Sequence, residues 1–171
     1  MNALEAFLYE ISKFFLMPVL AVLCAMFLFA LFAAGTLLFD MVLRATRGQA
    51  RQPLVQYRRR HPQANAEAVE LYLLKLLEPL RVTSRVAPML GLVATMIPMG
   101  PALVAVSAGN AQGIAQNLVV AFSAVIVALL AAAITYVVLS VRRRWLLAEL
   151  NGLLNDEAHE HLAPALEAGR G

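Results

Sequence analysis

Charged residues and cysteine are scarce in this sequence of 171 residues. Only 15% of the residues are Asp, Glu, Lys or Arg, and 61% are hydrophobic, whereas a soluble domain has about 25% charged and about 45–50% apolar residues. Cys24 is the single cysteine, which excludes an intrachain disulfide and a zinc site built from several thiolates. The composition therefore argues against an ordinary soluble domain and predicts an integral membrane protein.

The longest stretch without charge lies between Arg85 and Arg142, where no Asp, Glu, Lys, Arg or His occurs. About 20 helical residues cross a hydrocarbon core of about 30 Å. Residues 86–141 therefore suffice for two crossings, which we expect to be joined by an uncharged linker at Ser107–Gln116. In the first of these two crossings, the cluster Pro98–Pro101 predicts a kink or local unwinding.

A third apolar run, 14–43, contains Asp40 as its one charged residue. As a helix it would be about 45 Å long, so it must tilt or project beyond the membrane. Together with the two crossings of 86–141, it predicts an all-α membrane protein with three transmembrane helices.

Basic residues predict which side of the membrane each segment occupies. Residues 44–85 hold nine basic side chains, which are Arg44, Arg47, Arg51, Arg58, Arg59, Arg60, Lys75, Arg81 and Arg85. By the positive-inside rule, this loop and the tail after Arg142–Arg144 are cytoplasmic, and the N-terminus is outside. Because the basic residues flank apolar runs, the net charge of +3 does not indicate nucleic-acid binding.

These observations divide the chain into five predicted segments. We expect an amphipathic N-terminal segment, a first transmembrane helix, a cytoplasmic basic and helical loop, a transmembrane hairpin and a cytoplasmic C-terminal tail. Their predicted bounds are 1–13, 14–43, 44–85, 86–145 and 146–171.

Small residues recur at steps of three and four in both arms of the hairpin. They are Pro88, Gly91, Thr95, Pro98 and Ala102 in the first arm, and Ala121, Ala124, Ala128, Ala131 and Thr135 in the second, with Ser123 alongside. Small faces let membrane helices pack closely. The same faces, with their isolated hydroxyls, could also line a narrow polar path or surround a partner helix.

Asp40 allows two interpretations, because carboxylates inside membranes are costly and often functional. An interfacial ion pair with Arg44, one turn later, is the structural interpretation, and proton handling is the functional one. Likewise, the run Arg58–Arg60 is either a cluster facing lipid headgroups or a specific anion site.

The residues of this sequence do not form a pattern typical of a catalytic site. No nucleophile and base pair, metal cluster or phosphate loop can be assembled, so we expect neither an enzyme nor a bound cofactor. His159 and His161 could bind a metal, but residues at i and i+2 do not face each other on a helix, so we predict no metal site.

One motif in the hairpin is similar to that of a known family. The segment from Ala87 to Thr95, Ala-Pro-Met-Leu-Gly-Leu-Val-Ala-Thr, resembles Ala-Pro-Leu-Leu-Gly-Leu-Leu-Gly-Thr of the MotA/TolQ/ExbB proton channel family. Ala102-Leu103 follows where the family often has Ala-Phe. The likeness covers roughly Leu77–Trp145, and the predicted topology agrees with that of TolQ and ExbB. Because the cytoplasmic parts are brief for this family, the chain resembles a reduced member.

The resemblance implies an ion-driven motor subunit in the bacterial inner membrane. In this family, a homo-oligomer, usually a pentamer, surrounds a pair of single-span ExbD/TolR/MotB-like partners whose aspartate carries the proton. Because 86–141 has no carboxylate, either a partner supplies it, as in the family, or this chain does not conduct. Thr95 matches the family's second-span threonine and would face that carboxylate. The implied path or partner-facing set is Thr95, Ser123, Thr135, Pro88, Gly91 and Pro98.

The sequence also departs from the family pattern. Val125 stands where TolQ and ExbB carry a threonine, and Ala94 and Pro98 replace glycines. Ser123 or Thr135 could supply the lost hydroxyl. If neither does, the alternative is a non-conducting membrane scaffold of an envelope or secretion complex. The coupled ion, H⁺ or Na⁺, is left open.

Overall fold

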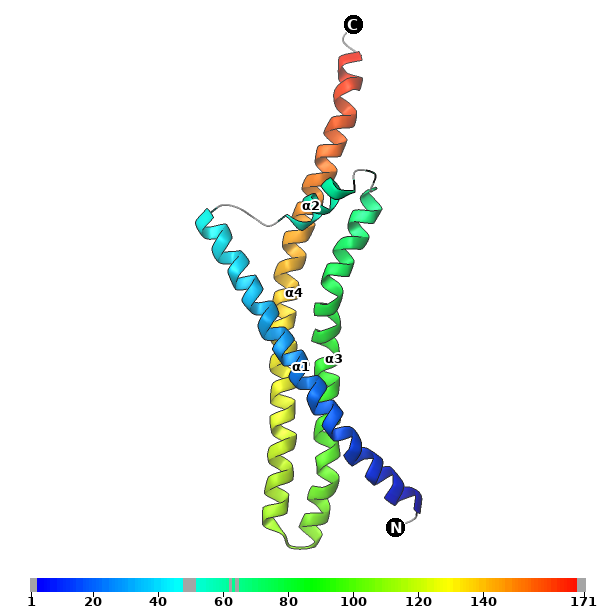
Figure 1. Cartoon of the computed structure of the whole chain (residues 1–171), viewed down its shortest axis with the longest axis vertical. Helices are drawn as coiled ribbons and strands as arrows, with labels where there is room; N and C mark the ends of the chain where they lie inside the picture. Colours follow the sequence, from blue (N-terminus) through cyan, green and yellow to red (C-terminus); the bar gives the residue numbers. More distant parts are fainter. Residues whose placement is uncertain (1–2, 48–51, 62, 64, 169–171) are drawn as a thin grey trace. The chain divides into compact units, whose positions relative to one another are not determined.

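The computed structural model contains four α-helices within its described residues and no strand there. Backbone is described for 3–47, 52–61, 63 and 65–168, and side chains for 7, 10, 11, 14–46, 52–61, 63 and 65–155. The helices are α1 (Ala3–Arg47), α2 (Pro53–Arg60), α3 (Ala66–Ser107) and α4 (Ala111–Ala168), as drawn in Figure 1. The predicted all-α class is confirmed.

Three of these helices are long and apolar enough to cross a membrane. The candidate spans are Phe14–Thr46 in α1, Ala66–Ser107 in α3 and Ala111–Asn155 in α4. The prediction of three membrane-spanning helices is therefore confirmed, while the sidedness of the termini stays a prediction. At 1.5 Å per residue, the 42 residues of α3 extend for about 63 Å, well beyond a core of about 30 Å.

The helices continue through several predicted boundaries. α1 includes both the predicted N-terminal segment and the first span, with Pro18 inside it. α3 likewise includes the second half of the predicted loop, and it stays helical through Pro98 and Pro101, so the local unwinding that we considered there does not occur. Neighbouring helices can stabilise a proline-containing helix in this way by packing against it.

The predicted linker Ser107–Gln116 is too long, because α4 already begins at Ala111. Gly109 has φ +67°, the left-handed conformation that glycine adopts readily at a helix end. The N–H of Asn110 donates to the Ala105 carbonyl at 2.9 Å, and Asn110 Oδ1 accepts the Gly113 N–H at 3.0 Å. Asn110 thus closes α3 and caps α4 at once.

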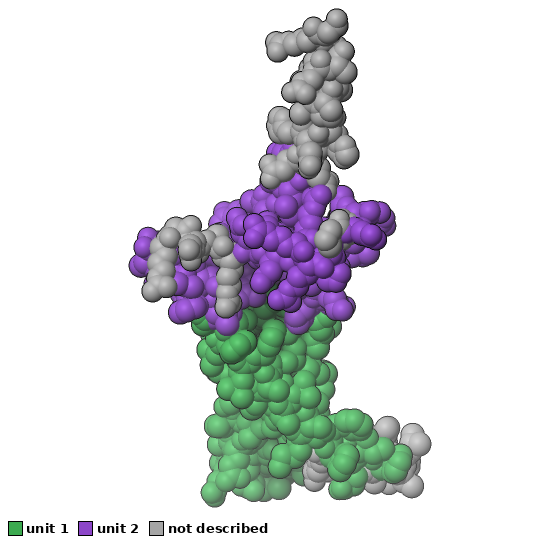
Figure 2. Space-filling model, turned by 45° about the horizontal axis from the view of Figure 1, so that its top comes forward, with its two compact units in different colours: residues 1–35, 80–137 green, residues 36–79, 138–171 purple. Residues whose placement is uncertain are grey.

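The chain forms two compact units, coloured separately in Figure 2. Unit 1 comprises residues 1–35 and 80–137, and unit 2 comprises residues 36–79 and 138–171. Each long helix contributes to both units, and each unit has its own core.

The core of unit 1 is built largely from alanine. In this unit, α3 and α4 run antiparallel on either side of their turn (Figure 1), and α1 packs against both. One cluster contains Leu23, Ala94, Ala124 and Ala128, and a second contains Ala30, Ala87, Ala131 and Ala132. Large side chains such as Phe32, Met96 and Phe122 are exposed. Small residues inside and large apolar residues outside are typical of helices that pack within lipid.

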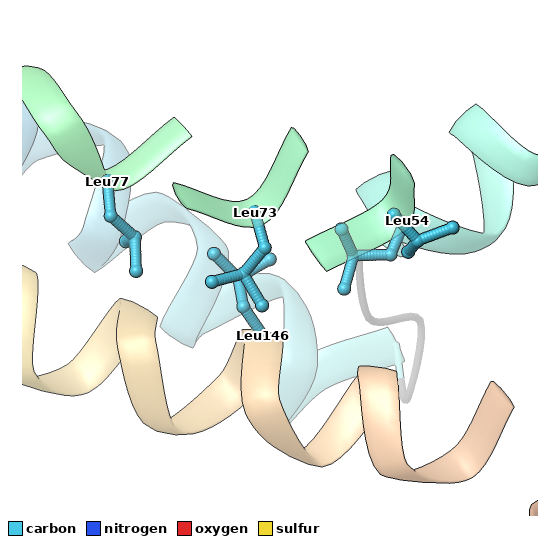
Figure 3. Packing of buried hydrophobic residues seen from close by; sticks show 5 residues of the cluster. Leu54, Leu73, Leu77 and Leu146 are labelled. Atoms are coloured by element: carbon cyan, nitrogen blue, oxygen red, sulfur yellow. The ribbon is translucent and has the colours of Figure 1, made fainter. Parts of the chain in front are cut away.

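The core of unit 2 is built from larger side chains. Leu54 of α2, Leu73 and Leu77 of α3, and Leu146 of α4 point toward one another in Figure 3, and Val69 completes their cluster. Tyr57 of α2 also stacks on Tyr72 of α3, with ring centroids 4.2 Å apart. Unit 2 therefore holds α2 against two long helices through an aliphatic and aromatic core.

Candidate functional site

In unit 1, the buried stripes of α3 and α4 repeat about every seven residues. Buried positions on α3 include Ala87, Gly91, Ala94, Pro98 and Ala102, and those on α4 include Ala121, Ala124, Ala128, Ala131 and Thr135. Alternating steps of three and four are the spacing of left-handed helix pairs. The predicted face of the second hairpin arm matches the buried stripe fully.

In the first hairpin arm, the buried stripe differs from the predicted face by one residue at two positions. Ala87 and Ala94 are fully buried, whereas Pro88 and Thr95 are half-buried. Two adjacent small residues satisfy the sequence pattern equally well, and the alanines fit the closer contact. Thr95 therefore lies at the edge of the packed face.

Gly91 marks a close approach of α3 and α4 in unit 1. A Cβ atom built on Gly91 would lie 2.6 Å from the Cβ of Ala128 and 3.7 Å from the Cα of Val125. Only a residue without a side chain fits at such a distance, which is the usual role of glycine between membrane helices. Val125, where the resemblance places a threonine, is half-buried beside this crossing.

The three predicted hydroxyls have different environments. Thr95 donates its hydroxyl to the Leu92 carbonyl at 2.7 Å, and its oxygen can still accept a hydrogen bond. Thr135 is fully buried and donates to the Ala131 carbonyl. Ser123 is exposed. The structure thus places Thr135 inside the helix packing and leaves Thr95 and Ser123 accessible from outside the chain.

Asp40 lies in unit 2, and its partner differs from the expected one. The expected pair with Arg44 is absent, and Asp40 Oδ2 is instead 3.9 Å from a terminal nitrogen of Arg142. The same nitrogen donates to Thr36 Oγ1 at 2.8 Å. Helical spacing suggested Arg44, but the tertiary fold brings the end of the third predicted span to Asp40. The structural interpretation of Asp40 gains support from this contact.

Sequence reasoning did not identify Glu149 as a structural anchor. Glu149 Oε1 accepts the N–H groups of Leu54 and Val55 at 2.9 and 3.0 Å. These donors lie in the first turn of α2, and Gln52, the residue before that helix, makes no side-chain capping bond. Glu149 therefore caps α2 from another helix. No sequence signal links residues so far apart.

The Glu149 carboxylate also has a charged neighbour. Besides the two backbone N–H groups that it accepts, it interacts with the Arg44 charge.

Among the side chains that the structure describes, no group of three His, Cys, Asp or Glu could hold a metal ion. The side chains of His159 and His161 lie outside the described set.

The long apolar helices and their close packing define the chain as a multi-pass membrane protein. A family model, that of the MotA/TolQ/ExbB proton channel family, matches residues 36–153. The chain belongs to this family. The match includes the hairpin motif and extends into α2 and the last part of α1. No curated protein and no solved structure matches the chain.

Proposed function

We propose that this chain is a non-enzymatic subunit of a proton-driven motor in the bacterial inner membrane. Copies of the chain, five in a ring, would surround single-span ExbD/TolR/MotB-like helices and convert the ion gradient into mechanical work. The main support for this proposal is the family match over residues 36–153. The hairpin also has no charged side chain between Arg85 and Arg142. Since the hairpin itself offers no carboxylate, the proposed carrier comes from another chain.

The packing of unit 1 supports Thr95 as the group that meets this carboxylate. Thr135 is fully buried within the chain, whereas Thr95 is half-buried at the edge of the packed stripe. Since its proton is donated to Leu92, the Thr95 oxygen is free to accept a hydrogen bond from a protonated carboxyl group or from water. Ser123, which is exposed, is the second hydroxyl that another chain could reach.

Replacing Thr95 by valine should reduce proton flux by about ten-fold or more. Valine keeps the branched shape but removes the acceptor, and leaving a buried donor without its partner costs about 1–3 kcal/mol. Flux would be measured in liposomes that contain the chain and its single-span partner. Thr46→Val is the matched control, because Thr46 is exposed and its hydroxyl also donates to its own helix, at Val42. Unchanged flux after both Thr95→Val and neutralisation of the partner's aspartate would refute the proposal.

Asp40→Asn should leave proton flux within about two-fold of the unmodified chain in the same liposomes. The Asp40 side chain is 17% exposed and lies 3.9 Å from an Arg142 nitrogen, which is the outer limit of an ion pair, and the same nitrogen also donates to Thr36. Asparagine keeps the side-chain shape and can still accept a hydrogen bond. A loss of flux as large as that caused by Thr95→Val would instead assign proton handling to Asp40.

A non-conducting membrane scaffold is the second candidate function. It is favoured by Val125, which stands where the resemblance places a threonine, and by the complete burial of Thr135. The scaffold predicts a partner without an intramembrane carboxylate and no flux above that of empty liposomes.

A further inference from the structure

Unit 2 contains a cavity of about 380 Å³ whose wall is partly polar and partly apolar. This volume lies within the range of small-molecule sites, about 300–1,000 Å³. Arg44, Arg142 and Gln52 contribute polar groups to its wall, and Leu76, Trp145 and Leu146 contribute apolar surface. The cavity is distinct from the hairpin residues of the proposed ion path, since all of its lining residues belong to unit 2.

Most charges around the cavity already have partners. Arg142 contacts Thr36 and Asp40, and Glu149 accepts two backbone N–H groups of α2. Arg44 differs. Its charge acts on Glu149 and its guanidinium carbon lies 3.9 Å from the centroid of the Trp145 ring, but its Nε is buried without a hydrogen-bond partner among the described residues. Buried donors are almost always satisfied in proteins, so the Arg44 Nε indicates a missing acceptor.

The position of the cavity in the sequence limits what this acceptor can be. Asp40 is at the end of the first predicted span, and Arg142 and Trp145 directly follow the third. Arginine and tryptophan at span ends are typical of the headgroup layer of a bilayer. A phosphodiester has several oxygens for the Arg44 guanidinium and the Gln52 amide, and the adjoining glycerol and acyl carbons match the apolar wall.

We propose that this cavity binds the phosphodiester group of a phospholipid from the adjacent leaflet, with Arg44 as the main ligand. Free phosphate shares the same oxyanion chemistry, but it would leave the apolar wall formed by Leu76 and Leu146 without a partner. The proposal concerns the chain alone and does not depend on ion conduction, so its failure would leave the proposed motor function unaffected.

The single tryptophan makes the test direct, because Trp145 lines the cavity. We would titrate the purified full chain in detergent with short-chain phosphatidylglycerol and follow Trp145 fluorescence. Diacylglycerol, which lacks the phosphate, and inorganic phosphate are the two comparison probes. The expected result is a saturable change with phosphatidylglycerol alone. An equal response to diacylglycerol, or saturation by inorganic phosphate at the same concentrations, would overturn the proposal.

Arg44→Gln should weaken phosphatidylglycerol binding by about ten-fold or more, as expected for loss of a charge-assisted hydrogen bond. Arg143→Gln is the matched control, because it removes the same charge from a nearby exposed position. Its affinity for phosphatidylglycerol should stay within about two-fold of that of the unmodified chain. If Arg44→Gln does not fold, Arg44→Lys replaces it, because lysine keeps the charge but lacks the Nε donor and the planar group. Lipid occupancy by native mass spectrometry would provide a second readout. Equal binding by the Arg44 variant and the control would overturn the proposal.

Discussion

Gly91→Ala should destabilise the packing of α3 on α4 in unit 1 by about 1–3 kcal/mol, the usual cost of overpacking. The added Cβ would lie 2.6 Å from the Ala128 Cβ, and an alanine side chain has no rotamer with which to move away. The helices must therefore separate by some tenths of an ångström. Separation weakens the alanine contacts that follow along the stripe, since dispersion falls steeply with distance. Reversible unfolding in mixed micelles, followed by circular dichroism, would measure the loss.

Two further variants distinguish this collision from a general effect of removing glycine. Gly35→Ala makes the same change in the part of α1 that belongs to unit 1, where an added Cβ would have nothing within 4 Å. It should be neutral or slightly stabilising, because alanine favours the helix. Ala128→Gly combined with Gly91→Ala exchanges the two residues and should recover most of the lost stability. Equal destabilisation by Gly91→Ala and Gly35→Ala would contradict the tight crossing.

The number of spans was predictable from the sequence because it depends on properties that short segments carry by themselves. Hydropathy and length are enough to identify a crossing, and the absence of charge between Arg85 and Arg142 identified the hairpin. The turn was predicted too long for a different reason. Its cap at Asn110 follows a left-handed Gly109, and the surrounding small uncharged residues are equally compatible with a helix or a linker.

The candidate site was less predictable, because its details depend on contacts between distant segments. Pro88 and Ala87, like Thr95 and Ala94, fit a small-residue stripe equally well until the partner helix determines which of them is buried. Arg142 as the partner of Asp40, and Glu149 as the cap of α2, are tertiary contacts that helical spacing cannot indicate. The family resemblance suggested the role proposed for Thr95, and the packing then distinguished the half-buried Thr95 from the fully buried Thr135.

Leu54→Ala should detach α2 from unit 2, at a cost of about 2–5 kcal/mol for a buried leucine. Leu54 is 0% exposed and contacts the cluster of Leu73, Leu77 and Leu146 (Figure 3). A helix of eight residues is too short to persist in water without tertiary contacts. We therefore expect the amides of α2 to exchange with deuterium at least about ten-fold faster in the variant.

Leu71→Ala is the control for this change, because Leu71 belongs to the same unit on α3 but is 60% exposed. It should leave the amide exchange of α2 unchanged, since it creates no cavity.

Detachment of α2 has a second consequence, because Gln52, Pro53 and Gln56 form part of the wall of the proposed lipid cavity. Leu54→Ala should therefore weaken phosphatidylglycerol binding although it removes no charge. If α2 stayed protected in the Leu54 variant, the Glu149 cap and the tyrosine stack would be sufficient to hold it, and the leucine cluster would not be its main anchor.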